Sequence, residues 1–344
     1  MLGIQSISSK ISRVERHFPP RRKPRTVLLV NPTQESSTPP LDLMKLSTFL
    51  RSRGYVPELK RGALKKISIE PWAVVLTCVF SGEIPDLRGA ISQIRRLWPH
   101  AKTILSGVLP RRFGDKAHGD FGVGVLDEAS EVLLDELVAD YDLTPDWDAS
   151  ILITSKGVCP RECSHCETAA RGKGVTRIIA NWRIQLNSKL PRIEVWDNTL
   201  MLTPREHLVR VGQALSATEK PVDLVCGLTP NGVEEAELRW RIGQLAWVRL
   251  APARLECNME EELPRFHRLL AHTRSIFGDN TKYRAFAVVN GAEAPAKASE
   301  RIQRMRAEGV EVDIVPYTPH YWEERGTYAN RESGWTTDDL ASFQ

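Results

Sequence analysis

The sequence lacks the features that mark several classes of protein. No apolar run approaches the roughly 20 residues needed to span a bilayer, and the amino-terminal residues have no apolar core of the signal-peptide kind. The net charge is only +4, from 47 Lys+Arg and 43 Asp+Glu, which is too small to indicate a nucleic-acid partner. We therefore expect a cytoplasmic protein that does not engage a membrane and keeps its six cysteines reduced.

Composition and hydrophobic pattern divide the 344 residues into five segments. Residues 1–25 hold seven basic residues and one Glu, which predicts a basic flexible arm. Residues 139–150 hold four Asp and one Pro without a period, and we interpret them as a linker. Because a chain of this length favours two cores over one, we expect the linker to separate a domain over 26–138 from a second domain over 151–318. Residues 319–344 then form a carboxyl-terminal extension.

The first domain alternates apolar runs with helical patterns. Runs typical of strands buried on both faces lie at 26–32, 72–80 and 101–107. Helical spacing is found over 41–53 and 87–98, and a strand runs into a helix over 122–137. Strands that alternate with helices predict a parallel sheet with helices on both faces, as in a Rossmann-like or flavodoxin-like α/β domain.

The second domain repeats this alternation without a sequence repeat. We expect six strands, at 151–158, 192–200, 222–228, 247–252, 283–289 and 310–317. We expect helices between them, over 204–217, 233–245, 260–276 and 296–309. Six β/α units in this length predict a partial (β/α)6 barrel, smaller than the eight-unit form.

Three cysteines form a cluster directly after the first strand of this barrel. Cys159, Cys163 and Cys166 have the spacing CxxxCxxC, and they follow the strand at the end where β/α barrels carry their chemistry. Three close thiols in a reducing compartment indicate a metal more often than a disulfide. A [4Fe–4S] cluster on three Cys leaves one iron open, whereas structural zinc requires a fourth ligand, for which His165 is poorly spaced. We favour iron–sulfur and keep zinc and no metal as alternatives.

The motif in this setting resembles the radical S-adenosylmethionine (radical SAM) superfamily, in the branch with an amino-terminal cobalamin-binding-like domain. The resemblance implies that Cys159, Cys163 and Cys166 bind the [4Fe–4S] cluster and that the open iron binds S-adenosylmethionine. The cluster then cleaves this cofactor reductively to a 5′-deoxyadenosyl radical, which abstracts hydrogen from the substrate. It also implies that His165, where the family usually has an aromatic residue, lies near the adenine.

Polar residues at the ends of the later strands are candidate cofactor contacts. Asp197 and Asn198 lie at the end of the second strand, where the resemblance implies contact with the polar parts of S-adenosylmethionine. Capping of a turn is the structural alternative. Arg249 interrupts an apolar strand, so it must be paired or lie at the barrel mouth, near the cofactor carboxylate. The remaining candidate contacts are Asn290, Gly291 and Tyr317.

Cys226 ends the third strand of the barrel. If its side chain points inward, it could act catalytically by donating a hydrogen atom to a substrate radical. Such a cysteine is more often a small core residue.

The first domain is similar to the cobalamin-binding domain that precedes many radical SAM barrels, with two departures. Only Glu128 matches the acidic turn that often ends that domain, and no Asp-x-His-x-x-Gly sequence supplies a histidine for cobalt. A corrin also requires small residues where backbone approaches it, and Ser106-Gly107-Val108 offers one glycine. Cobalamin is therefore a possible cofactor, with methyl transfer as its reaction. Without it we expect hydrogen abstraction that leads to oxidation, rearrangement or epimerisation.

The sequence leaves two functions open. The first is a radical SAM enzyme with a small-molecule substrate and an electron donor of the flavodoxin or ferredoxin type. The second is a non-catalytic, zinc-stabilised binding protein with a degenerate barrel.

Overall fold

The computed structural model describes most of the chain. The described residues are 16–33, 38–64, 68–79, 83–107, 119, 121–157, 176–229, 233–257, 260–289, 293–316 and 334–342. The chain divides into two compact units, with the break between Trp147 and Asp148. Among the helices so described, none has the length and apolarity needed to cross a membrane.

The first unit is a five-stranded parallel sheet in the order β2-β1-β3-β4-β5. Its strands are β1 (Arg25–Asn31), β2 (Tyr55–Arg61), β3 (Ala73–Thr77), β4 (Lys102–Ser106) and β5 (Gly124–Val125). Its helices are α2 (Leu41–Ser52), α3 (Ile84–Leu97) and α5 (Glu128–Asp135), and a 3-10 turn, η2, covers Tyr141–Leu143. The chain order β1, β2, β3 and the sheet order β2, β1, β3 place a topological switch point between β1 and β3.

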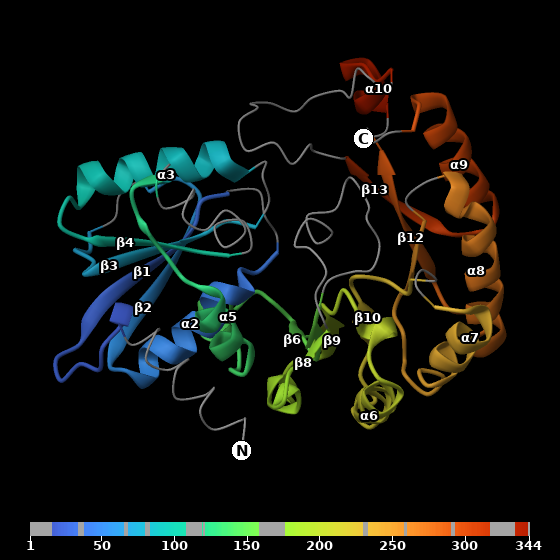
Figure 1. Cartoon of the computed structure of the whole chain (residues 1–344), viewed down its shortest axis with the longest axis horizontal. Helices are drawn as coiled ribbons and strands as arrows, with labels where there is room; N and C mark the ends of the chain where they lie inside the picture. Colours follow the sequence, from blue (N-terminus) through green and yellow to red (C-terminus); the bar gives the residue numbers. More distant parts are fainter. Residues whose placement is uncertain are drawn as a thin grey trace. The chain divides into compact units, whose positions relative to one another are not determined.

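Each face of this sheet has its own apolar core. Leu28 and Val30 of β1 pack with α3, whereas Val27 and Leu29 pack with α2. Figure 1 shows α3 on one face of the sheet and α2 with α5 on the other. Because alternate residues of a strand point to opposite faces, burial on both faces explains why β1 and β3 are almost uninterrupted apolar runs.

The second unit contains six parallel strands in chain order. The first sheet holds β6 (Ala149–Leu152), β9 (Arg192–Val195) and β10 (Val222–Leu224), and the second holds β11 (Ala253–Glu256), β12 (Tyr283–Val289) and β13 (Glu311–Pro316). Isolated parallel bridges, Val222 with Leu250 and Leu228 with Leu255, join the two sheets. The result is an open arc, since no pairing between β6 and β13 closes the barrel in the described part of the chain. The α/β fold class expected from the sequence is confirmed.

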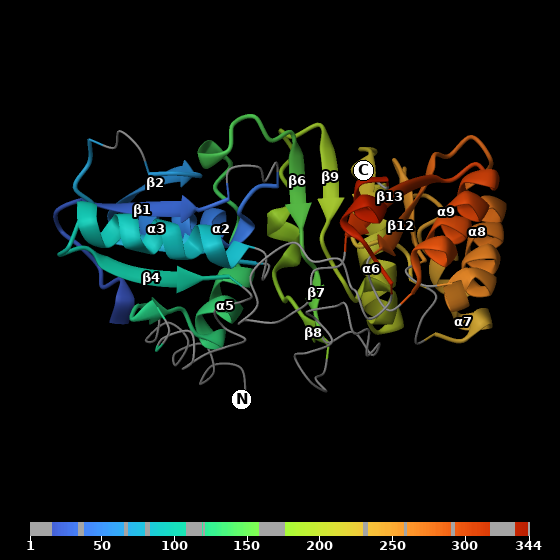
Figure 2. The ribbon, with the colours of Figure 1, turned by 90° about the horizontal axis from the view of Figure 1, so that it is seen from above.

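Helices line the outside of this arc (Figure 2). The larger ones are α6 (Arg205–Ser216), α7 (Glu235–Gly243), α8 (Leu263–Phe277) and α9 (Pro295–Ala307). Short 3-10 helices are η4 (Trp182–Gln185), η5 (Leu200–Leu202) and η6 (Glu260–Glu262), and α10 covers Thr337–Ser342. Helix α8 packs on β11, and α9 packs on β12 and β13.

The strand predicted over 247–252 is wrong. Residues 244–248 form turns and a bend after α7, Trp247 is 86% exposed, and only Leu250 makes a single β-bridge. The fourth strand is β11, which begins at Ala253, directly after a cis Ala251–Pro252 peptide bond.

Candidate functional site

The cysteine motif lies between the two strands of a small antiparallel ribbon. Strands β7 (Ser155–Lys156) and β8 (Arg177–Ile178) pair just beyond the carboxyl end of β6. The segment between them, 158–175, carries Cys159, Cys163, His165 and Cys166 and lies outside the described residues.

The two residues that flank that segment, Gly157 and Thr176, lie in contact. A Cβ atom on Gly157 would lie only 2.8 Å from the Cα atom of Thr176, so only glycine allows this approach. The Nδ2 atom of Asn198 donates to the Gly157 carbonyl at 3.3 Å. The Ile179 amide donates to the Thr154 carbonyl at 2.9 Å. This bond joins the residues that enter and leave the ribbon, Thr154 and Ile179, which we call the stem.

Asp197, after β9, binds the entering strand of this stem. Its Oδ1 atom accepts the Thr154 amide at 2.7 Å, and its Oδ2 atom accepts the Ser155 amide at 3.1 Å. Its Oδ2 atom also accepts the hydroxyls of Thr154 and Ser155. Burial raises the pKa of Asp197 to about 6, although these hydrogen bonds act in the opposite direction.

His207 of α6 reaches the same threonine from the outer side of the arc. Its Nε2 atom lies 2.9 Å from the Thr154 hydroxyl, and its ring contacts Trp182 edge to face. Because that hydroxyl donates to Asp197, it accepts from His207, which fixes the Nε2–H tautomer. Burial also lowers the pKa of His207, which favours the neutral ring.

An ion-paired arginine occupies the inner face of the arc. Arg254 of β11 donates to both carboxylate oxygens of Asp223 on β10, at 2.6 and 2.8 Å, and to Asp313 on β13 at 2.9 Å. Its guanidinium lies 5.4 Å from the centre of the Phe286 ring on β12. The Asp223 carboxylate raises the already high pKa of Arg254, so the group stays charged. One side chain thus links strands from both three-stranded sheets.

A second arginine secures the carboxyl ends of β11 and β12. Arg301 of α9 is fully buried and donates to the carbonyls of Cys257 and Val288, at 2.9 and 2.8 Å. It also pairs with Glu293 at 2.7 Å, whose own carbonyl accepts the indole N–H of Trp335. The sequence did not lead us to Arg254, Arg301 or Glu293. For Arg254, the available signal was a charged residue inside the short run Ala-Arg-Leu-Glu.

The structure places Arg249 at the opposite end of the sheet from Asp197. It is exposed, and its carbonyl accepts the amide of Val222, the first residue of β10. It therefore lies at the amino end of the parallel sheet, whereas Asp197 and the ribbon lie at the carboxyl end. The expected strand position of Arg249 is corrected, and Arg254 is the arginine that forms ion pairs on the inner face of the arc.

Cys226 is exposed in the turn after β10, ahead of Gly227 with its φ of +76°. Asn290, Gly291 and Tyr317 lie outside the described residues. Within the described ranges, no group of three His, Cys, Asp or Glu side chains could hold a metal ion.

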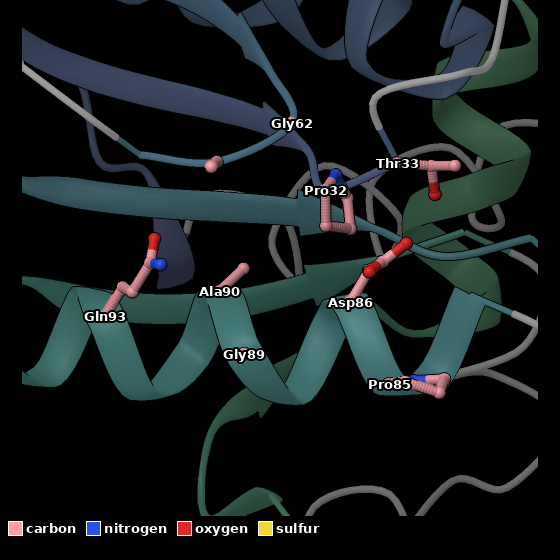
Figure 3. A pocket seen from close by; sticks show the side chains of 9 residues that line it. Pro32, Thr33, Gly62, Pro85, Asp86, Gly89, Ala90 and Gln93 are labelled. Carbon is pink, nitrogen blue, oxygen red and sulfur yellow. The ribbon is translucent and has the colours of Figure 1, made fainter. Parts of the chain in front are cut away.

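A cavity of about 370 Å³ opens at the carboxyl edge of the first unit's sheet (Figure 3). One wall is a face of α3 with Asp86, Gly89, Ala90 and Gln93, and the other holds residues that follow β1 and β2. Small residues dominate the lining, and a Cβ atom on Gly89 would meet nothing within 4 Å. Such a surface allows a flat ligand to approach the backbone closely.

No protein-family model matches this sequence, and no curated protein is similar enough in sequence to match it. The fold, however, is similar to known structures. One is the radical S-adenosylmethionine methyltransferase TsrM from Kitasatospora setae, solved with its tryptophan substrate and an S-adenosylmethionine analogue. The two chains are 14% identical, with a TM-score of 0.63 over 86% of this chain and 75% of that one.

A further similar structure is OxsB, a cobalamin-dependent S-adenosylmethionine radical enzyme. It is 13% identical, with a TM-score of 0.48 over 90% of this chain and 51% of that one, so this chain spans about half of its length. The resemblance inferred from the cysteine motif is confirmed at the level of the fold by TsrM.

Proposed function

We propose that this chain is a radical SAM enzyme. One observation carries the proposal: the CxxxCxxC segment is inserted in a ribbon at the carboxyl end of the first of six parallel strands. In β/α arcs the chemistry lies at that edge, and three soft thiolates at this spacing are suited to an iron–sulfur cluster. The fold shared with TsrM supports the same function.

The residues that would hold the cluster are Cys159, Cys163 and Cys166. When bound, the cluster supplies the electron that cleaves S-adenosylmethionine reductively. The fit rests on the donor set and on the flanking residues: Gly157 and Thr176, on either side of the cysteine segment, lie in contact. We assign adjacent cofactor contacts to His165, Asn290, Gly291 and Tyr317, and to the amide of Asn198 at the foot of the ribbon.

We propose that the substrate is a small molecule bound at the inner face of the arc. Arg254 is held there by two carboxylates, which fix the position of its guanidinium and balance its charge. Phe286 beside it provides an apolar surface. These groups bind and orient the substrate. Cys226, at the carboxyl edge, is the candidate hydrogen-atom donor. The electron donor that we propose is a protein of the flavodoxin or ferredoxin type.

Cobalamin-dependent methyl transfer is the second candidate reaction, and the cavity of the first unit favours it. The cavity adjoins the β1/β3 switch point, and Gly62, Ala63, Gly89 and Ala90 let backbone approach a flat macrocycle. Titration of the protein with hydroxocobalamin, followed by the absorbance of the protein-bound corrin after gel filtration, tests this part independently of the cluster.

The main test is formation of 5′-deoxyadenosine. Anaerobic protein reconstituted with iron and sulfide should hold about four of each per chain and should release 5′-deoxyadenosine from S-adenosylmethionine with dithionite. A variant with Cys159, Cys163 and Cys166 all changed to alanine should do neither. One zinc per chain without iron would instead support the zinc-stabilised binding protein.

A further inference from the structure

We propose that Asp197, together with Thr154 and His207, is a positioning residue that holds the cysteine segment in place, rather than a contact of S-adenosylmethionine. This inference rests on the proposed function, and it changes the role that the sequence suggested for Asp197. The reason is where the carboxylate points: toward Thr154 and Ser155 at the entry to the ribbon.

The contacts fix the backbone as well as the side chains. Asp197 accepts the consecutive amides of Thr154 and Ser155 and both of their hydroxyls, and all three residues are buried. Amide–carboxylate hydrogen bonds are charge-assisted and directional. Two consecutive backbone donors on one carboxylate therefore fix both the position and the direction of the chain as it leaves β6.

The same chain leads directly to the cysteines. Cys159 is four residues beyond Ser155, a span of at most roughly 14 Å when fully extended. The exit is also tied down, because Ile179 donates to the Thr154 carbonyl and Gly157 packs against Thr176. Both ends of the cysteine segment thus depend on Thr154.

His207 completes the arrangement from α6. Its Nε2–H donates to the Thr154 hydroxyl, so that this one hydroxyl connects a helix, a strand end and the stem. The histidine Nδ1 finds no hydrogen-bond partner among the described residues, so the ring's one polar contact is the one to Thr154. Outer groups of this kind orient metal ligands, and their loss typically lowers metal affinity about 10- to 100-fold.

The test measures iron release in the full-length protein. Wild type and four variants, Thr154→Val, Thr154→Ser, Asp197→Asn and Thr203→Val, are reconstituted anaerobically with iron and sulfide. A chelator of ferrous iron, bathophenanthroline disulfonate, is then added, and the rate of iron loss is followed by absorbance. Thr203→Val is the matched control. It also removes one buried threonine hydroxyl from the second unit, but that hydroxyl donates to the Leu200 carbonyl and not to Asp197.

We expect Thr154→Val and Asp197→Asn to lose iron about tenfold faster or more than wild type. Thr154→Ser, which keeps the hydroxyl, and Thr203→Val should stay within about twofold of wild type. Low-temperature electron paramagnetic resonance of the reduced cluster should change in the first two variants only. Equal iron loss from Thr154→Val and Thr203→Val would overturn the inference while leaving the proposed function intact.

A readout without metal separates the two proposals further. Hydrogen exchange of the iron-free protein should show faster exchange of the Thr154 and Ser155 amides in Asp197→Asn but not in Thr203→Val. Wild-type protein that binds no iron would end the proposed function and this inference with it, whatever the exchange shows. If Asp197→Asn does not fold, the comparison of Thr154→Val with Thr203→Val still decides the result.

Discussion

At the scale of single residues, Arg301 shows how a full charge is stabilised inside the second unit. Its guanidinium uses its planar set of donors on two strand-end carbonyls and one buried carboxylate. Lysine has one donor group and cannot reproduce that fork. Arg304, one turn away on the same helix, has a half-exposed side chain paired with Glu260 and Glu300.

We expect Arg301→Lys to lower the free energy of unfolding by about 3 kcal/mol, because it leaves buried acceptors without donors. Arg304→Lys should change it by less than about 0.5 kcal/mol, since exposed ion pairs contribute little. Urea unfolding followed by circular dichroism measures both. Equal effects in the two variants would show that burial of Arg301 is not what makes it stabilising.

The pKa of Asp197 gives a pH-dependent contribution to stability. Because burial raises this pKa to about 6, the folded protein binds the proton more tightly than the unfolded chain, whose carboxyl has its ordinary value near 4. Stability from this group is therefore greatest below pH 4 and falls as the pH rises through about 6. His207, whose pKa is lowered, acts in the opposite direction.

The comparison of wild type with Asp197→Asn isolates this contribution, because His207 is present in both. From pH 5 to pH 7.5, the stability of wild type relative to Asp197→Asn should fall by on the order of 1 kcal/mol. Thermal unfolding at several pH values gives the difference. A difference that stays constant over this range would mean that the carboxyl keeps its ordinary pKa.

At the scale of elements, two helix glycines have opposite surroundings. Gly89 of α3 has open space where a Cβ atom would be, whereas a Cβ atom on Gly212 of α6 would lie 2.5 Å from the Gln244 carbonyl oxygen. Glycine inside a helix costs roughly 0.5–1 kcal/mol relative to alanine. Gly89→Ala should therefore stabilise the protein by about that amount, and Gly212→Ala should destabilise it, because α6 must move away from the residues after α7. Thermal unfolding of both variants tests this, and stabilisation by Gly212→Ala would contradict the close helix packing.

The strands that the sequence predicts well are those buried on both faces. Strands β1 and β3 are apolar runs for that reason, and β4 is buried from Ile104 to Ser106. Strand β2 has no such pattern, since it is an edge strand that contains Pro57 and the charged residues Glu58, Lys60 and Arg61. The sequence pattern of strand β11 is difficult to recognise, because the charged residues Arg254 and Glu256 alternate with its buried residues. The apolar residues before it form turns and a single bridge.

The candidate site was predictable only where residues are neighbours in sequence. The spacing of Cys159, Cys163 and Cys166 needs no fold to be recognised. Asp197 was predicted as a polar residue at a strand end, but its partner Thr154 is 43 positions away and depends on the pairing of β6 with β9. Arg254 with Asp313, 59 positions apart, likewise becomes visible only once the strands are in order.

At the scale of the whole molecule, we expect the first unit to fold by itself. Both faces of its sheet have an apolar core. Residues after α5, expected to be part of a linker, bind α2: Asp140 accepts Ser47 and Arg51, and the Thr48 hydroxyl donates to the Val138 carbonyl. The amino-terminal part of the unit therefore extends to Trp147, beyond the boundary at residue 138 expected from the sequence.

We expect a fragment of residues 1–147 to unfold in one cooperative transition. A fragment of residues 1–137 should be less stable by about 2 kcal/mol or more, because it lacks Val138 and Asp140 and therefore the hydrogen bonds that they accept from α2. Urea denaturation followed by far-ultraviolet circular dichroism compares them, because Trp147 is present only in the longer fragment and would alter its fluorescence. A 1–147 fragment without a cooperative transition would show that the unit depends on the rest of the chain.

The contact of Gly157 with Thr176 has a consequence for how such a protein can diversify. Because Gly157 and Thr176, the residues that flank 158–175, lie in contact, we expect that an insertion, deletion or exchange between them need not displace any strand. The cysteine segment should then tolerate replacement as a unit, provided that a small residue is kept at position 157.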